Sequence, residues 1–157
     1  MAALRLASAQ ALEEAARVHR PRLLILDPVV SAVAADSHKN TEVRRGLQPV
    51  VDLAERLGCA FRDGDEFHSD ANRAKMHAGI PLNDDDRKPW LESIRTYMDE
   101  TTSGGGSLVV ACSALKQRYR DVLRGKTGNT EFVYLKGDFD LLQGRLAARK
   151  DHFFNPN

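Results

Sequence analysis

The chain has 157 residues, 42% of them hydrophobic and 29% charged, with a formal net charge of +1. This length suits one domain with a single core, and the even charge balance argues against a surface that coats nucleic acid. Two cysteines are too few for a disulfide framework, which favours a reducing compartment such as the cytoplasm. No apolar run approaches the roughly 20 residues of a membrane span, so no membrane association is expected.

The first part of the chain predicts two helices and two strands in alternation. Leucines and alanines among charges indicate a short helix within residues 3–18. The continuous apolar run 23–26 is typical of a strand buried on both faces. Helical spacing of apolar residues then runs over 41–57 and stops at Gly58. Residues 59–62 predict the second strand.

The rest of the chain continues the alternation of helices and strands. We expect helices over residues 70–78, from Asp84 through Met98, over 114–124 and from 139 to 150, and strands over 108–112 and 131–135. Strands that alternate with helices predict a parallel α/β sheet with right-handed crossovers. The expected domain is one unit over 1–157, in which 1–58 is an atypical N-terminal segment.

Polar residues follow three of the predicted strands. Asp27 follows the first, Asp63 and Asp65 follow the second, and Ser113 and Lys116 follow the third. Ligands of open α/β sheets bind outside the carboxyl ends of the strands. The three strand ends therefore predict one common site.

The residues at this site suit phosphoryl transfer, which needs an oriented hydroxyl, a metal ion and cations that absorb charge. Asp63 and Asp65 are the candidate catalytic carboxylates. One of them would hold Mg²⁺ through water, with Asp63 as the candidate, and the other would accept the proton of the substrate hydroxyl. The candidates for binding a sugar acid are His68, Lys75, Ser113, Lys116 and Arg120.

Two arginines near the end of the chain are the candidate nucleotide lid. Arg145 and Arg149 are four residues apart and would share one helix face. They would close over the phosphates.

Each of these motifs also has a structural explanation. An Asp-Gly-Asp turn is most often a simple strand-to-helix connection, and Asp84 to Asp86 more often serve a helix N-terminus than a metal. His68 alone would usually be a hydrogen-bonded loop residue. The two arginines would usually form a solvated helix face. The order and spacing of the motifs carry more weight than any one of them.

Over about residues 53–154 the chain resembles the gluconokinases, small phosphotransferases of the nucleoside-monophosphate-kinase type. The segments that carry this resemblance are Leu53–Gly58, Asp63–His68, Asn72 with Lys75 and Met76, Gly79–Trp90, Ala111–Lys116, Tyr119–Asp121, Tyr134–Asp138 and Arg145–Phe154. The resemblance implies a three-layer parallel sheet of the P-loop type. It also implies phosphorylation of D-gluconate to 6-phosphogluconate by Mg-ATP. A homodimer is compatible with it.

Two departures from the family pattern bear on activity. The family opens with a strand and a Gly-rich phosphate loop, whereas this chain has residues 23–30 and a polar loop in that place. It also stops at Asn157, where the family continues with another strand and helix, so a C-terminally truncated fold is expected. Residues 1–58 resemble instead a fragment of RecA-like ATPases, in which Asp27 would end the metal-side strand.

The leading hypothesis is a gluconokinase-like enzyme whose ATP chemistry is impaired by the missing loop. An alternative is a sugar-acid-binding or partner-binding module without catalysis. A third is a RecA-like ATPase fragment.

Overall fold

A computed structural model describes residues 4–6, 13–14, 17, 23–27, 48, 50–126, 130–135 and 140 of the chain. Its strands are β1 (Leu4–Leu6), β2 (Leu23–Asp27), β3 (Ala60–Asp63), β4 (Leu108–Ala111) and β5 (Thr130–Leu135). Its helices are the 3₁₀ turn η2 (Gly64–Phe67), α3 (Asp70–His77), α4 (Asp84–Ser103) and α5 (Gln117–Arg124). Residues 50–56 are helical as well.

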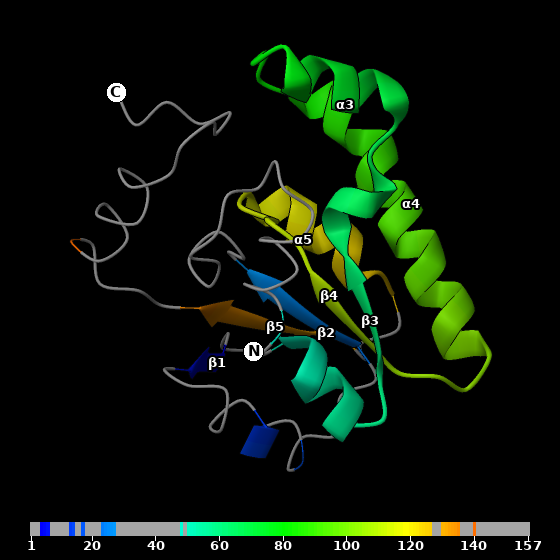
Figure 1. Ribbon diagram of the computed structural model, residues 1–157. Helices are drawn as coiled ribbons and strands as arrows, with labels where there is room; N and C mark the ends of the chain where they lie inside the picture. The colour runs from blue at the N-terminus through cyan, green and yellow to red at the C-terminus, as the bar shows by residue number, and fades with distance from the viewer. Residues whose placement is uncertain are drawn as a thin grey trace.

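The five strands form one parallel sheet in the order β1-β5-β2-β4-β3 (Figure 1). β2 lies in the middle, where Ile25 is opposite Val110 of β4 on one side and Phe132 of β5 on the other. β3 pairs with β4, so Asp63 is opposite Ala111. Because all strands run in the same direction, the carboxyl ends of β3 and β4 meet at one edge of the sheet.

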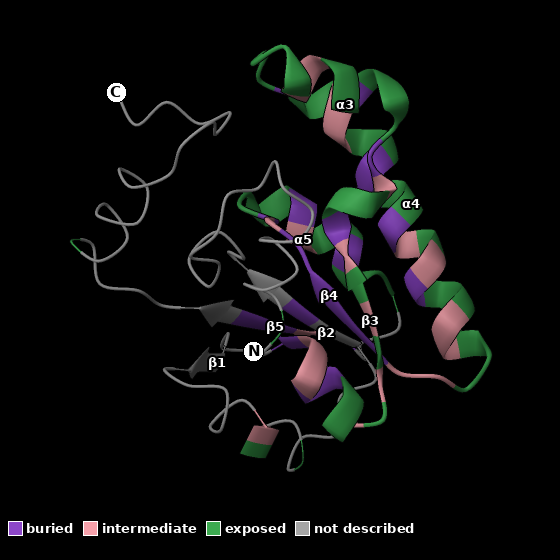
Figure 2. Ribbon diagram, viewed as in Figure 1, coloured by how far each residue is buried: buried purple, intermediate pink, exposed green. Residues whose placement is uncertain are grey.

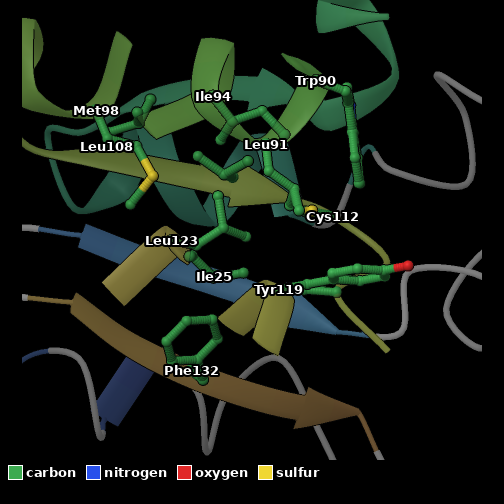
Figure 3. Close-up of a cluster of buried hydrophobic side chains, with 12 residues drawn as sticks. Ile25, Trp90, Leu91, Ile94, Met98, Leu108, Cys112, Tyr119, Leu123 and Phe132 are labelled. Carbon is green, nitrogen blue, oxygen red and sulfur yellow. The ribbon is translucent and has the colours of Figure 1, made fainter. Parts of the chain in front are cut away.

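Helices cover both faces of this sheet (Figures 1 and 2). One face packs against α4 and α5 in a core that Figure 3 shows from within, where Ile94, Leu123 and Ile25 are fully buried. On the other face, Leu53 of the helix over 50–56 packs with Val109. Successive residues of β4 point to opposite faces, and both faces are covered. This is why all four of its residues are apolar and buried.

Side-chain caps define where α3 and α4 begin. The Ser69 hydroxyl accepts a hydrogen bond from the Asn72 backbone N–H at the start of α3. At the start of α4, Asn83 and Asp86 each accept from the other's backbone N–H, at 2.8 and 3.1 Å. This reciprocal pair satisfies two N–H groups that the first helical turn leaves unpaired. The expected role of the acidic run at a helix N-terminus is therefore confirmed for Asp86.

The predicted α/β fold is confirmed, with two corrections. The helix expected within 3–18 is wrong for Leu4–Leu6, which form β1 and pair with β5; residues 13, 14 and 17 are helical. The helix expected over 114–124 begins only at Gln117. The start of the helix over 41–57 and most of the helix over 139–150 lie outside the described residues. No helix in the described ranges combines the length and apolar character that a membrane crossing requires.

Candidate functional site

The Asp-Gly-Asp turn joins β3 to η2 and holds two carboxylates next to each other. Asp63 is the last residue of β3, and its Oδ1 accepts a hydrogen bond of 3.0 Å from the Asp65 backbone N–H. Burial raises the pKa of Asp63 to about 6, the charges of Asp65 and Glu66 add to this, and the hydrogen bond from Asp65 opposes it. The Asp65 side chain is 81% exposed. The turn therefore pairs a partly buried carboxylate with one that is open to solvent.

Gly64 allows this turn to lie directly against the end of β4. A Cβ atom at position 64 would lie 2.8 Å from the backbone oxygen of Ala111 and 3.3 Å from the Cβ of Cys112. The backbone of a paired strand cannot move away as a flexible side chain can. The small size of residue 64 is therefore required to bring the ends of β3 and β4 into contact.

We expect Gly64→Ala to lower the free energy of unfolding by about 1 to 3 kcal/mol, because the added methyl overpacks this contact. Urea denaturation of the variant and the parent protein measures the change. Gly104→Ala is the matched control, since a Cβ there meets nothing nearer than 3.5 Å. Equal stability of the Gly64 variant and the parent would show that the contact is not tight.

His68 follows the turn and is buried, with 6% of its surface exposed. Its ring stacks on Trp90 of α4 at a centroid distance of 4.6 Å, and Trp90 Nε1 donates a 2.7 Å hydrogen bond to the Gly64 carbonyl. Burial, together with the charges of Arg73 and Arg87, lowers the pKa of His68 to about 4. His68 is therefore a neutral imidazole at pH 7, fixed between the turn and α4.

The cations expected to bind substrate have protein partners in this structure. Lys75 Nζ lies 2.6 Å from Asp86 Oδ1, and Lys116 Nζ lies 2.8 Å from Asp84 Oδ1. Both pairs are partly exposed, so each can exchange its partner at small cost.

Polar contacts connect the start of α5 to Asp84 of α4 and to the segment that follows β4. Asp84 also contacts Arg118 and Tyr119, and with Lys116 these groups hold the pKa of Asp84 below its usual range. Arg120 donates to the carbonyls of Ala114 and Leu115 at 2.8 and 2.9 Å. The segment after β4 is thereby tied both to α4 and to α5.

The remaining sequence candidates differ in what the structure shows of them. Ser113 is half-buried just after β4. Asp27 ends β2, with its backbone opposite Tyr134. Arg145 and Arg149 lie outside the described residues. The structure thus brings Asp63, Asp65 and His68 together in one turn, next to the end of β4.

Two arginines were missed by the sequence analysis. The charges of Arg73 and Arg87 act on His68, and Arg87 also donates to the Leu82 carbonyl at 2.5 Å. The sequence could have indicated Arg87, because it lies three residues before Trp90 and such spacing places both on the same side of a helix. These two arginines add positive charge beside the turn.

The turn could hold a magnesium ion only if water and substrate phosphates supplied most of its ligands. No group of three His, Cys, Asp or Glu side chains able to hold a metal occurs among the described residues. Mg²⁺ is commonly held by one or two carboxylates together with water and substrate phosphates. The charge of Asp65 raises the pKa of Asp63, and a divalent cation would relieve that repulsion.

The chain is similar to one family model and to several curated proteins. Residues 2–62 match the family model described as an AAA domain. A probable gluconokinase of Dictyostelium discoideum is 50% identical over 111 residues, which are 67% of this chain and 56% of that protein. The thermoresistant gluconokinase of Escherichia coli (strain K12) is 48% identical over 103 residues, 66% of this chain and 59% of that protein. The chain therefore spans somewhat more than half the length of these two curated relatives.

A solved structure extends the similarity to the fold. The crystal structure of a gluconokinase from Sinorhizobium meliloti 1021 superposes with a TM-score of 0.62 at 34% identity, covering 85% of this chain and 68% of that one. The parallel sheet and its covering helices, together with this match, identify an α/β protein with the P-loop-type fold of sugar kinases. Within that class, the chain belongs to the gluconokinase family.

Proposed function

We propose that this chain is a gluconokinase-like phosphotransferase that acts on D-gluconate and ATP to give 6-phospho-D-gluconate and ADP. The observation that carries the proposal is the turn at the end of β3, which places Asp63 and Asp65 against the end of β4. In this proposal the exposed Asp65 carboxylate accepts the proton of the attacking hydroxyl. The probable gluconokinase of Dictyostelium discoideum, 50% identical over 111 residues, supports the choice of substrate.

Kinases of the P-loop class generally use Mg-ATP, in which the metal neutralises charge on the phosphate oxygens. Asp63 is the proposed Mg²⁺ ligand, acting through water. Its hydrogen bond from the Asp65 N–H fixes one carboxylate oxygen, Oδ1. When bound, Mg²⁺ would neutralise charge on the phosphate oxygens, and the Asp63 carboxylate would help to hold it.

The sugar acid would lie over the turn, with its carboxylate among cations. His68, Lys75, Ser113, Lys116 and Arg120 are the proposed binding residues. Lys75 and Lys116 would exchange Asp86 and Asp84 for substrate oxygens. Arg73 and Arg87 add to the positive potential, because both act on His68. Arg145 and Arg149 are the proposed lid over the phosphates.

The reaction is proposed to be slow in this chain. The sequence contains no Gly-rich phosphate loop of the family type. Such a loop supplies several backbone N–H donors and a lysine to the transferring group. Loss of a single preorganised donor typically costs about a hundredfold in rate. We further propose that residues 1–157 form one domain, since β1 and β2 of the N-terminal segment share a sheet with β3 to β5. We propose the cytoplasm as its location, because two cysteines are too few for a disulfide framework.

Gluconate-dependent release of ADP from Mg-ATP tests the proposed reaction. We expect Asp65→Asn to lower the rate by about a hundredfold or more, since it removes the proton acceptor. Glu66→Gln, a change of the exposed neighbouring carboxylate, is the matched control and should retain turnover. Turnover that survives in the Asp65 variant would contradict the assigned role. A folded parent protein without turnover would contradict the kinase proposal itself.

Two further candidate functions each have a supporting observation. The absence of the Gly-rich loop favours a sugar-acid-binding or partner-binding module, which calorimetry would reveal as gluconate binding without ATP binding. The match of residues 2–62 to an AAA domain favours an ATPase fragment. ATP hydrolysis that depends on DNA or on oligomer formation would select that reading.

A further inference from the structure

A buried histidine–asparagine pair lies behind the Asp-Gly-Asp turn. The side chain of Asn72, on α3, is buried beside His68. Asn72 Nδ2 lies 2.8 Å from the backbone oxygen of Asp86 and 3.4 Å from Nδ1 of His68. The pair therefore connects the turn to the first residues of α4.

The Asp86 carbonyl determines which end of the Asn72 amide faces the histidine. A carbonyl oxygen only accepts hydrogen bonds, so the amide atom 2.8 Å away must be the NH₂ group. That group has two hydrogens, and the second is available to His68 Nδ1, which is 3.4 Å away. Nδ1 must then accept, because two donors cannot share one hydrogen bond.

The single proton of the neutral ring is therefore placed on Nε2. Burial and the charges of Arg73 and Arg87 lower the pKa of His68 to about 4, so the ring carries one proton at pH 7. Nε2 lies 4.0 Å from Asp65 Oδ1. Stacking on Trp90, with 10° between the ring planes, fixes the plane in which the N–H lies.

We propose that His68 is a positioning residue for Asp65: Asn72 holds the ring with its Nε2–H toward one oxygen of the Asp65 carboxylate, leaving the other oxygen for the substrate hydroxyl. This inference rests on the proposed function, in which Asp65 accepts the proton. The Asp65 side chain is 81% exposed, so few contacts restrict its rotation. At 4.0 Å the two groups are beyond hydrogen-bond distance in this structure, so Asp65 would rotate toward the Nε2–H and then sample fewer orientations before reaction.

The position of the ring proton can be measured without any substrate. Long-range ¹H–¹⁵N correlation spectra of the full chain at pH 7 should show His68 with a protonated Nε2 and an unprotonated Nδ1. Asn72→Asp replaces the donor with an acceptor of the same shape, so Nδ1 should become protonated in that variant. A protonated Nδ1 in the parent protein would overturn the proposal.

Two histidine variants separate positioning from a structural role. His68→Gln keeps an N–H donor near the place of Nε2, whereas His68→Asn keeps one only near the place of Nδ1. We expect kcat to fall about tenfold or more in His68→Asn and to be largely restored in His68→Gln, whereas loss of a substrate contact alone would raise the gluconate KM in both variants. Equal losses in the two variants, or a change confined to KM, would overturn the inference.

Failure of the proposed reaction is distinguishable from failure of this inference. A parent protein without turnover would defeat the kinase proposal, and the nitrogen shifts would then decide the tautomer by themselves. Nε2 protonation that reverses in Asn72→Asp supports the inference in either case.

Discussion

Replacing Ile94 by alanine is expected to lower the free energy of unfolding by about 3 to 4 kcal/mol, the largest loss of stability for any single change considered above. Ile94 lies in α4 with none of its surface exposed, in the core that joins α4, α5 and the sheet. Figure 3 shows it on the α4 side of that core, above β4. Alanine removes three carbon atoms and leaves a cavity that paired strands cannot close.

Urea denaturation followed by tryptophan fluorescence measures this loss, because Trp90 belongs to the same core. The matched control is Leu115→Ala, a deletion of similar size at a side chain that is 67% exposed. Its stability should change by less than about 0.5 kcal/mol. A loss below about 1 kcal/mol in the Ile94 variant would mean that α4 does not pack on the sheet as described.

In metal-free protein, substitutions of His68 and Asp63 are expected to change the pH dependence of the free energy of unfolding in opposite directions. The pKa of His68 is about 4 in the folded chain against an ordinary 6.5, so between these values the unfolded chain binds more protons and acid destabilises the fold. The pKa of Asp63 is about 6 against an ordinary 3.8, so in that window the folded chain binds more protons and acid stabilises it. In the parent protein the two contributions oppose each other.

Each variant removes one of these contributions. Relative to the parent, His68→Gln should gain about 2 kcal/mol of stability between pH 7 and pH 4.5, and Asp63→Asn should lose about as much. Chemical denaturation at several pH values in the presence of EDTA measures both slopes. Comparison with the parent removes the effect of the other carboxylates. Parallel slopes in the three proteins would show that neither group has a shifted pKa in the fold.

Strands that are buried on both faces could be predicted from the sequence. The apolar runs of β2, β4 and β5 predicted strands because both faces of the sheet are covered by helices. Leu4–Leu6 was misread because three residues among alanines resemble a helix, while their strand conformation depends on pairing with β5, more than 120 residues later. Local propensity contains no information about such a partner.

The sequence predicted which strand ends form the candidate site, but not the contacts within it. Parallel topology alone brings Asp63 and Ser113 to one edge. The partners of Lys75 and Lys116 were not predictable, because the acids Asp86 and Asp84 were assigned to the start of a helix and their reach toward α3 and α5 depends on the packing of three helices. The contribution of Asn72 likewise depends on a carbonyl of another helix.

The sheet order has a consequence for the time at which the chain can fold during synthesis. Among the strands that the structure describes, β1 pairs with β5 and β2 pairs with β4 and β5, so the described partners of both N-terminal strands lie beyond residue 100. Until β4 has been made, the apolar residues 23–27 have no neighbouring strand to hydrogen-bond with. During that time chaperones and other chains can bind them. β1 pairs with β5, so it joins the sheet only after Leu135 has emerged, although it is made more than 120 residues earlier.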